Sequence, residues 1–331
     1  MRRAVFIFCV DRETDPVAGH VLNAIMTGCT LVSTGLEIDG HPVLEVPGLR
    51  DTIVSIVRTN EVVSNDYARY APLFNERFGD ADVIGIVNWH EGANAPNAIF
   101  SVQTTGDLAT GTFSKVDPRI TRGLLLAIEA ERITSDLHNF RTYLEATHWS
   151  GVKAGDAGTC LADLRPSAID IEIGSSPGDW ANPHAARVLA RALLHTFDHM
   201  DEPVRSVLCV GGVHFEPSFT TAVLQSFDNL PIAASHVLPN HWLVSGGYDH
   251  ESRLINLRAC VDSIVGGIQA IVYHDKLKAP YKAVARLLAE ELGVPMLSHK
   301  QLRTALKAKD VAEWSRRGAS RRSRRAAQRD C

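Results

Sequence analysis

Several features that would decide a cellular class are missing from this chain of 331 residues. No apolar run is long enough for a transmembrane helix. The first apolar segment, AVFIFCV, is short and is followed at once by charge, so it predicts a first β-strand rather than a signal sequence. The six cysteines include no CxxC pair, and Cys9 and Cys209 lie inside apolar runs. We therefore expect buried, reduced thiols in a cytoplasmic protein with no membrane partner.

A strong overall charge is also absent, because the formal net charge is only -4 and gives no general attraction to nucleic acid. Positive charge is concentrated instead in the last sixteen residues, RRGASRRSRRAAQRDC. This segment is either a solvated, disordered tail or an arm that binds phosphates, and both can hold together. We expect one domain over residues 1–312 and a basic tail over 313–331. The oligomeric state stays open, with a monomer favoured.

Apolar runs rich in β-branched residues alternate with helical patterns along the whole chain. Strands are expected at 4–10, 52–58, 82–89, 98–104, 140–148, 168–174, 204–212, 232–238 and 270–275. Helices are expected at 15–28, 66–79, 118–133, 182–198, 218–227, 254–265 and 279–293, with a hairpin at 36–46 and a long loop at 150–167. This order predicts an α/β fold, in which a mixed sheet carries helices on both faces.

Four histidines stand beside glycine, proline or tryptophan near the ends of expected strands. They are His90 in IVNWHEG, His148 in LEATHWSG, His214 in VLCVGGVHFEP and His236 in AASHVLPNHW. An α/β fold gathers reactive groups at strand ends, so these side chains are expected to line one cleft. Neutral imidazoles bind zinc, and the same residues can serve without metal as general bases and oxyanion donors. No HExxH motif is present to decide between the two.

Two further segments indicate a site. Gly211 and Gly212 follow a buried strand, and the helix expected to begin near Ser218 presents free N–H groups to an anion. Neither a Walker loop nor a GxGxxG motif is present, so an ordinary tight turn is the alternative. Glu172, in IDIEIGSSPGDW, lies in an apolar run and needs a metal, a histidine or backbone amides as a partner. A carboxylate that caps a turn is the alternative there.

These segments resemble a known family, the archaeal and plant type of D-aminoacyl-tRNA deacylase, which is associated with zinc. VGGVHFEPSFT resembles its GG-x-H-Y/F-x-P segment, LEATHWSG its E-x-THHGP segment, and IEIGSSPGDW its EIGS-x-x-x-W segment. SHVLPNHW is similar to GHILP, WHEGANAPNAIFSVQTTGD to RH-x-S-x-S…LT-x-H-x-x-GN, and TDPVAGHVL to DPA-x-x-NI. The segments occur in the same order from about residue 4 to about residue 240.

The resemblance implies a three-layer α/β domain similar to peptidyl-tRNA hydrolases and purine nucleoside phosphorylases. It also implies hydrolysis of the ester that joins a D-amino acid to the terminal ribose of tRNA. Zinc would be held by His90, His214 and Glu172, or these residues would orient the attacking water. The acid/base groups would be His148 and His236, with Glu172, and the two histidines are alternatively further metal ligands. The substrate-binding residues would be Gly174, Ser175, Gly211, Gly212 and Ser218.

This chain departs from the family pattern at several positions. The second histidine of THH is Trp149, the histidine of LT-x-H is Gln103, and other departures are Trp89, Glu91, Ala93 and Val152. Two further hypotheses follow from them. A divergent homologue would act on another aminoacyl or acyl ester, or on a nucleoside. A non-catalytic RNA-binding protein would keep the histidines as structural residues and bind through the arginine tail.

Overall fold

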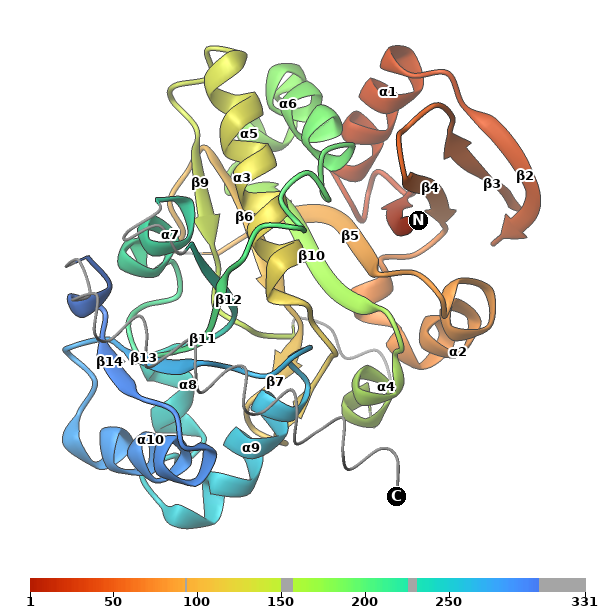
Figure 1. Cartoon of the computed structure of the whole chain (residues 1–331). Helices are drawn as coiled ribbons and strands as arrows, with labels where there is room; N and C mark the ends of the chain where they lie inside the picture. The colour runs from red at the N-terminus through yellow and green to blue at the C-terminus, as the bar shows by residue number, and fades with distance from the viewer. Residues whose placement is uncertain (93, 150–156, 226–230, 304–331) are drawn as a thin grey trace.

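The computed structural model describes residues 1–92, 94–149, 157–225 and 231–303 of the chain. The predicted basic tail and residues 150–156 of the expected long loop lie outside the described residues. The described rest of that segment contains α4 (Ala157–Asp163) and reaches the first residue of β10, so the expectation of a loop throughout 150–167 is wrong. In the described part, no helix is both long and apolar enough to cross a bilayer. Two larger sheets form the body of the protein, with one helix, α3 (Pro118–Thr134), between them (Figure 1).

The larger sheet has eight strands in the order β2-β3-β4-β1-β5-β10-β6-β9. Strands β4, β1, β5 and β10 are parallel, β6 runs antiparallel to β10, and β9 runs parallel to β6. Their bounds are β1 Arg2–Cys9, β2 Val32–Ile38, β3 His41–Val46, β4 Thr52–Thr59, β5 Val83–His90, β6 Ile99–Thr104, β9 Arg141–Leu144 and β10 Ser167–Gly174.

The smaller sheet is parallel and has four strands in the order β12-β11-β13-β14. Its strands are β11 Arg205–Val210, β12 Ile232–Leu238, β13 Ala270–Tyr273 and β14 Met296–Ser298. A separate ribbon pairs β7 (Gly106–Asp107) with β8 (Thr112–Phe113). The sequence pattern predicts the strands of this second sheet except β14, but not that they form a sheet of their own.

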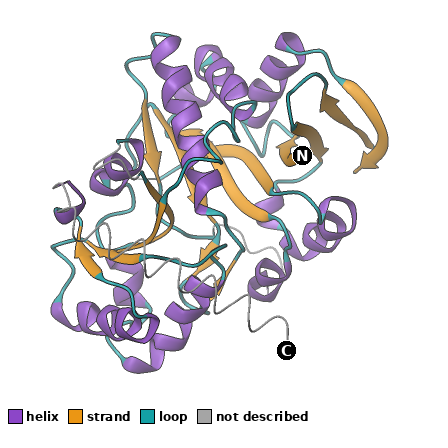
Figure 2. Ribbon diagram, viewed as in Figure 1, coloured by secondary structure: helices purple, strands orange, loops and turns teal. Residues whose placement is uncertain are grey.

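Helices cover the outer faces of both sheets, and most strands lie inside (Figure 2). Helices α1, α3 and α6 pack on one face of the large sheet, and α2 and α4 on the other. Helices α9 and α10 cover the far side of the small sheet. The helices besides α3 are α1 Ala18–Gly28, α2 Tyr67–Phe78, α4 Ala157–Asp163, α5 Pro177–Trp180, α6 Pro183–Leu193, α7 Pro217–Leu224, α8 Asn240–Ser245, α9 Leu254–Asp262 and α10 Ala279–Leu292.

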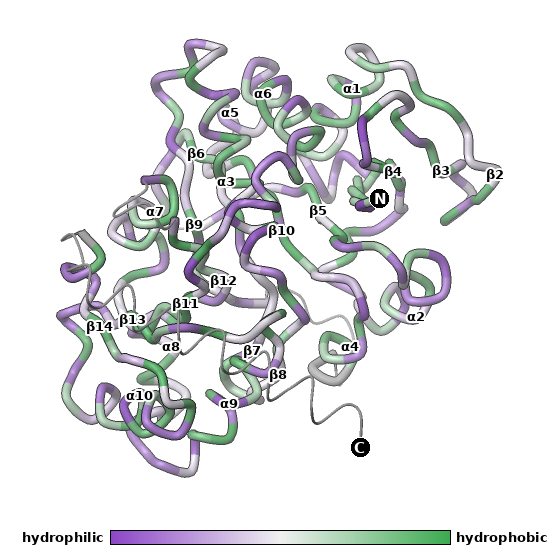
Figure 3. The backbone as a smooth tube through the Cα atoms, viewed as in Figure 1, coloured by the Kyte–Doolittle hydropathy of each residue, from purple (hydrophilic) through white to green (hydrophobic). Residues whose placement is uncertain are grey.

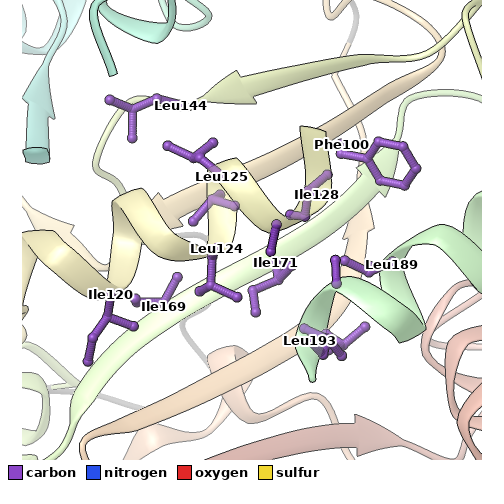
Figure 4. Packing of buried hydrophobic residues seen from close by; sticks show 14 of the residues in the cluster. Phe100, Ile120, Leu124, Leu125, Ile128, Leu144, Ile169, Ile171, Leu189 and Leu193 are labelled. Atoms are coloured by element: carbon purple, nitrogen blue, oxygen red, sulfur yellow. The ribbon is translucent and has the colours of Figure 1, made fainter. Parts of the chain in front are cut away.

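The main apolar core lies around α3. Leu124 and Ile128 of this helix pack with Ile169 and Ile171 of β10 and with Leu189 of α6 (Figure 4). The outer helices α6 and α10 alternate hydrophilic and hydrophobic positions along their length, as amphipathic surface helices do (Figure 3). On β10, isoleucines at alternate positions face this core, so the side chains of Asp170 and Glu172 lie on the opposite face.

Most of the expected elements are present, and the predicted α/β fold with helices on both faces is confirmed. Asp117 caps α3 through the backbone N–H of Arg119, and Gly293 ends α10 in the left-handed conformation. Two further expectations are wrong in extent. The strand expected at 140–148 ends at Leu144, and the helix expected from residue 15 begins at Ala18. Asp15 nevertheless accepts from the backbone N–H groups of Val17 and Ala18, as a residue that caps a helix start does.

Candidate active site

A carboxylate surrounded by histidines lies at the centre of the candidate site. Oε1 of the fully buried Glu145 is 2.6 Å from Nε2 of His214, 3.5 Å from Nε2 of His90 and 3.8 Å from Nδ1 of His148. Three of the four predicted histidines therefore meet around a residue that the sequence reasoning did not select. The structure thus brings His90, His148 and His214 together, and the prediction that they line one cleft with His236 and Glu172 stays a prediction.

The backbone explains why distant segments meet at Glu145. Just after β9, the N–H of Glu145 donates to the carbonyl of Val102 in the large sheet. The next N–H, of Ala146, donates to the carbonyl of His214, and the N–H of Thr147 donates to Val237 in β12. The segment 145–148 thus joins the two sheets and brings the His214 loop to the carboxylate.

His90 ends β5, and its ring orientation is fixed by a chain of hydrogen bonds. Nδ1 lies 2.9 Å from Oγ of Ser175, and this hydroxyl donates its own proton to the carbonyl of Pro96. The Ser175 hydroxyl must therefore accept from Nδ1–H, which leaves a lone pair on Nε2 toward Glu145. Burial lowers the pKa of His90 and favours this neutral form. Gly174 is required beside it, because a Cβ there would lie 2.7 Å from that of His90.

His214 is presented by the turn that Gly211 and Gly212 form. Both glycines have positive φ, and a Cβ on Gly212 would lie 2.8 Å from Cγ of Glu216. The Glu216 carboxylate accepts from the backbone N–H and the hydroxyl of Ser218 at the start of α7. The two glycines and Ser218 thus shape the loop that carries His214, and their predicted contact with substrate stays a prediction.

His148 extends the histidine cluster toward α8. Its Nδ1 lies 3.0 Å from the carbonyl oxygen of Ala146, which can only accept, so Nδ1 carries the proton. The ring contacts those of His214 and Trp242, with centroid distances of 5.1 Å and 5.3 Å. Burial lowers the pKa of His148, which keeps the imidazole neutral near pH 7. A further histidine of the SHVLPNHW segment, His241, contacts Trp242 at the edge of the cluster, with the two rings tilted by 48°.

Glu145 and Glu172 differ in protonation although both are buried. Burial alone would raise the pKa of Glu145, but the hydrogen bond from His214 outweighs it and lowers the pKa, together with the attraction of His148 and His90 in their protonated forms. Burial raises the pKa of Glu172 well above its usual range, and the charges of Glu145 and Asp170 add to the shift. Glu172 is thus neutral beside an ionised Glu145, and its Oε2 accepts a hydrogen bond from Ser101.

The histidine cluster lies within the part of the chain that matches a known protein family. A profile described as D-aminoacyl-tRNA deacylase matches residues 77–297, which include all the residues of the cluster. The chain belongs to the D-aminoacyl-tRNA deacylase family. A D-aminoacyl-tRNA deacylase of Pyrococcus furiosus is 31% identical over 233 residues, covering 69% of this chain and 78% of the relative. One of Pyrococcus abyssi is 23% identical over 291 residues, covering 86% and 97%.

The fold is shared with a solved structure as well. A crystal structure of a conserved protein of unknown function superposes with a TM-score of 0.68 at 17% identity, covering 91% of this chain and 96% of that one. At this identity the likeness shows the fold alone.

The donor set of this deacylase-family chain fits a metal ion such as zinc. Among the described residues, one ligand atom each of His90, Glu145 and His214 lie within 4.8 Å of one another. In this part of the chain Oε2 of Glu145 is buried without a hydrogen-bond partner, and the lone pair of His90 Nε2 faces the same carboxylate. Two imidazoles and one carboxylate are a known zinc ligand set. The predicted ligand Glu172 is not a member of this group.

Glu145 is the functional residue that the sequence reasoning missed. It stands in the quoted LEATHWSG segment, at the position of the first glutamate of the E-x-THHGP pattern, and it follows strand β9 directly. The departure Gln103 lies in the same region, where its Nε2 donates to Asp170 at 3.1 Å. Burial raises the pKa of Asp170 to about 6.

His236 lies outside the histidine cluster in this family member. Its ring is completely buried, with Nδ1 2.7 Å from Oγ1 of Thr104 and Nε2 3.0 Å from Oγ of Ser263. Burial lowers its pKa to about 3. Hydroxyl groups thus contact both ring nitrogens of His236 between the two sheets. The predicted acid/base role of His236 stays a prediction.

The buried His236 predicts acid-sensitive stability. With a pKa of about 3 when folded and about 6.5 when unfolded, the unfolded chain binds the extra proton between these values. Stability is therefore lost as pH falls from 6.5 toward 3 and is unaffected by this group at higher pH. Between pH 7 and 4.5 we expect the wild type to lose about 2–3 kcal/mol more than His236→Gln, from urea unfolding.

The exposed His138 supplies the control for this comparison, because its side chain is 69% exposed. The variant His138→Gln should keep the pH slope of the wild type. The comparison uses the change in the free energy of unfolding with pH, and not its value at one pH. A His236→Gln protein that is less stable at every pH therefore still tests the prediction. A slope of His236→Gln equal to that of the wild type would show that His236 accepts a proton in the folded state.

Proposed function

We propose that this chain hydrolyses the ester bond of D-aminoacyl-tRNA, releasing a free D-amino acid and tRNA. The observation that carries the proposal is the buried Glu145 carboxylate with His90, His148 and His214 around it. A carboxylate that orients imidazoles in a water-poor site is suited to activating water for attack on an acyl carbon. Membership of the deacylase family supports the choice of ester, and such a substrate implies tRNA as partner and the cytoplasm as location.

We further propose that His90, His214 and Glu145 hold a zinc ion. Such an ion, when bound, makes hydroxide available near neutral pH and polarises the ester carbonyl. Ser175 fixes the ring of His90 through Nδ1, as the outer partner of a ligand histidine does. His148, neutral and in contact with the cluster, would donate a proton to the departing ribose oxygen after gaining one from the attacking water. Glu172 would stay protonated and neutral, so that Glu145 carries the negative charge of this pair of carboxyl groups.

The test is the rate of hydrolysis of D-tyrosyl-tRNA and L-tyrosyl-tRNA by the full chain. We expect turnover of the D-ester and little of the L-ester, with loss of turnover after treatment with a chelator and recovery with zinc. Spontaneous hydrolysis without enzyme is the control for both esters. Folded protein with zinc supplied that cleaves neither ester would contradict the proposal.

Two departures favour a second candidate, a related enzyme that acts on another aminoacyl or acyl ester. Gln103 bonds Asp170 at a position where the family pattern carries a histidine, and Trp149 replaces a second histidine. A panel of N-acyl and L-aminoacyl esters tested with the same preparation separates the two candidates. Zinc-dependent turnover of a panel ester, without turnover of D-tyrosyl-tRNA, would favour the second.

A further inference from the structure

A cavity of about 240 Å³ opens beside the histidine cluster. Two tryptophans, Trp149 and Trp242, contribute to its wall together with Thr147 and His148. The rest of the wall comes from the backbone turn that starts at Gly106 and from the end of α8. The cavity is thus a small aromatic chamber.

His148 connects this cavity to the candidate catalytic centre. The same ring that lines the cavity lies 5.1 Å from the ring of His214, and its Nδ1 is 3.8 Å from Glu145. Trp242 also contacts both regions, since its ring centroid is 5.5 Å from that of His214. A group held in the cavity is therefore about one side chain away from the residues proposed to cleave the ester.

We propose that this cavity binds the terminal adenine of the tRNA acceptor end, an inference that rests on the proposed function. Every aminoacyl-tRNA carries this base, joined through one ribose to the ester. Proteins that bind unpaired RNA bases stack them on aromatic side chains. With the adenine against the indoles, the ribose spans His148 and the ester carbonyl comes to the His90–Glu145–His214 cluster.

The size of the cavity agrees with one base. Sites for drug-sized ligands measure roughly 300–1,000 Å³. At about 240 Å³, this cavity is too small for a whole aminoacyl-adenosine but large enough for one planar ring system. The ribose and the amino acid therefore lie outside it, on the side of the cluster.

Trp149 is the residue with which this proposal is tested. Its indole Nε1 donates to the carbonyl of Ser64 at 3.0 Å, which fixes the ring at the cavity wall. A rigid wall lowers the entropy lost when a base stacks on it. The family pattern carries histidine at this position, and the proposal gives its replacement by Trp149 a role in substrate binding.

The experiment compares three D-tyrosyl esters: those of tRNA, of adenosine and of methyl riboside, which has no base. The wild type should show a KM for the adenosine ester roughly tenfold below that for the riboside ester, the effect of one base–aromatic stack. Trp149→Ala should raise KM for the tRNA and adenosine esters by a similar factor and reduce the preference between adenosine and riboside. Trp149→Phe, which keeps a ring, should retain most of the preference.

Controls separate folding from binding. Ile255→Ala removes an exposed apolar side chain outside the cavity and should match the wild type, and circular dichroism checks that each variant is folded. Equal KM values of the wild type for the adenosine and riboside esters would overturn the proposal. A Trp149→Ala defect with D-tyrosyl but not D-alanyl esters would overturn it too, because the cavity would then hold the amino-acid side chain.

A second measurement keeps this proposal distinct from the proposed function. Adenosine is added to the wild type and to Trp149→Phe, and tryptophan fluorescence is recorded with methyl riboside as the blank. Saturable quenching by adenosine that is reduced in the variant supports the cavity even if no D-ester is cleaved. Absence of quenching in an enzyme that does cleave D-tyrosyl-tRNA overturns the cavity assignment and leaves the proposed function intact.

Discussion

Glu145→Gln is expected to lower kcat/KM for D-tyrosyl-tRNA by roughly 10²–10⁴-fold, the range that an acid/base group contributes. The change keeps the size of the side chain and removes its negative charge. It also removes the charge that strengthens the hydrogen bond from His214 at 2.6 Å, and it removes the carboxylate that lies 3.5 Å from Nε2 of His90. Imidazoles that Glu145 orients would then lose their fixed positions, so we expect the loss mainly in kcat.

A matched control is available for this substitution. Glu290 lies on the exposed surface of α10, and Glu290→Gln changes the net charge of the protein equally. It should leave kcat/KM within about twofold of the wild type, as surface substitutions usually do. Turnover by a folded Glu145→Gln protein at the rate of Glu290→Gln would show that the buried carboxylate is structural only.

His214→Ala is expected to remove bound zinc and turnover together. The side chain supplies one of three proposed ligands, and Nε2 lies 2.6 Å from the carboxylate that supplies another. Loss even of an outer partner of a ligand costs 10–100-fold in metal affinity. We therefore expect zinc affinity to fall by more than roughly 100-fold. Metal analysis after dialysis should find about one zinc per wild-type chain and almost none in the variant.

His138→Ala is the control for the zinc measurement, because this histidine is exposed and lies outside the cluster. Its zinc content and turnover should equal those of the wild type. Full zinc content in His214→Ala would place the metal elsewhere. Full turnover without metal would favour the metal-free alternative, in which the histidines act directly as bases.

The sequence allowed much of the fold to be predicted, for a physical reason. Buried β-branched runs and capped helices, such as α3 after Asp117, are local features that a pattern reports directly. The second sheet is not local, because it depends on which strands pair. The strand β14 (Met296–Ser298) is also too short to form a recognisable run.

The candidate site could be predicted only in part. His90, His148 and His214 were found from their neighbours in sequence, whereas Glu145 was not. The rule that reactive groups follow parallel strands does not apply to Glu145, since β9 and β6 run against β10. His236 carries the same sequence signal as the other histidines, yet hydroxyl groups enclose it between the sheets. Only the three-dimensional packing distinguishes them.

The most direct test of the central claim is a crystal structure with zinc and a stable analogue, adenosine that carries D-tyrosine through an amide. Anomalous scattering at the zinc edge should give a peak between His90, Glu145 and His214, with the analogue carbonyl beside it and the adenine against Trp149. A zinc peak elsewhere, or an analogue bound away from Glu145, would contradict the assignment of this cluster as the site of ester cleavage.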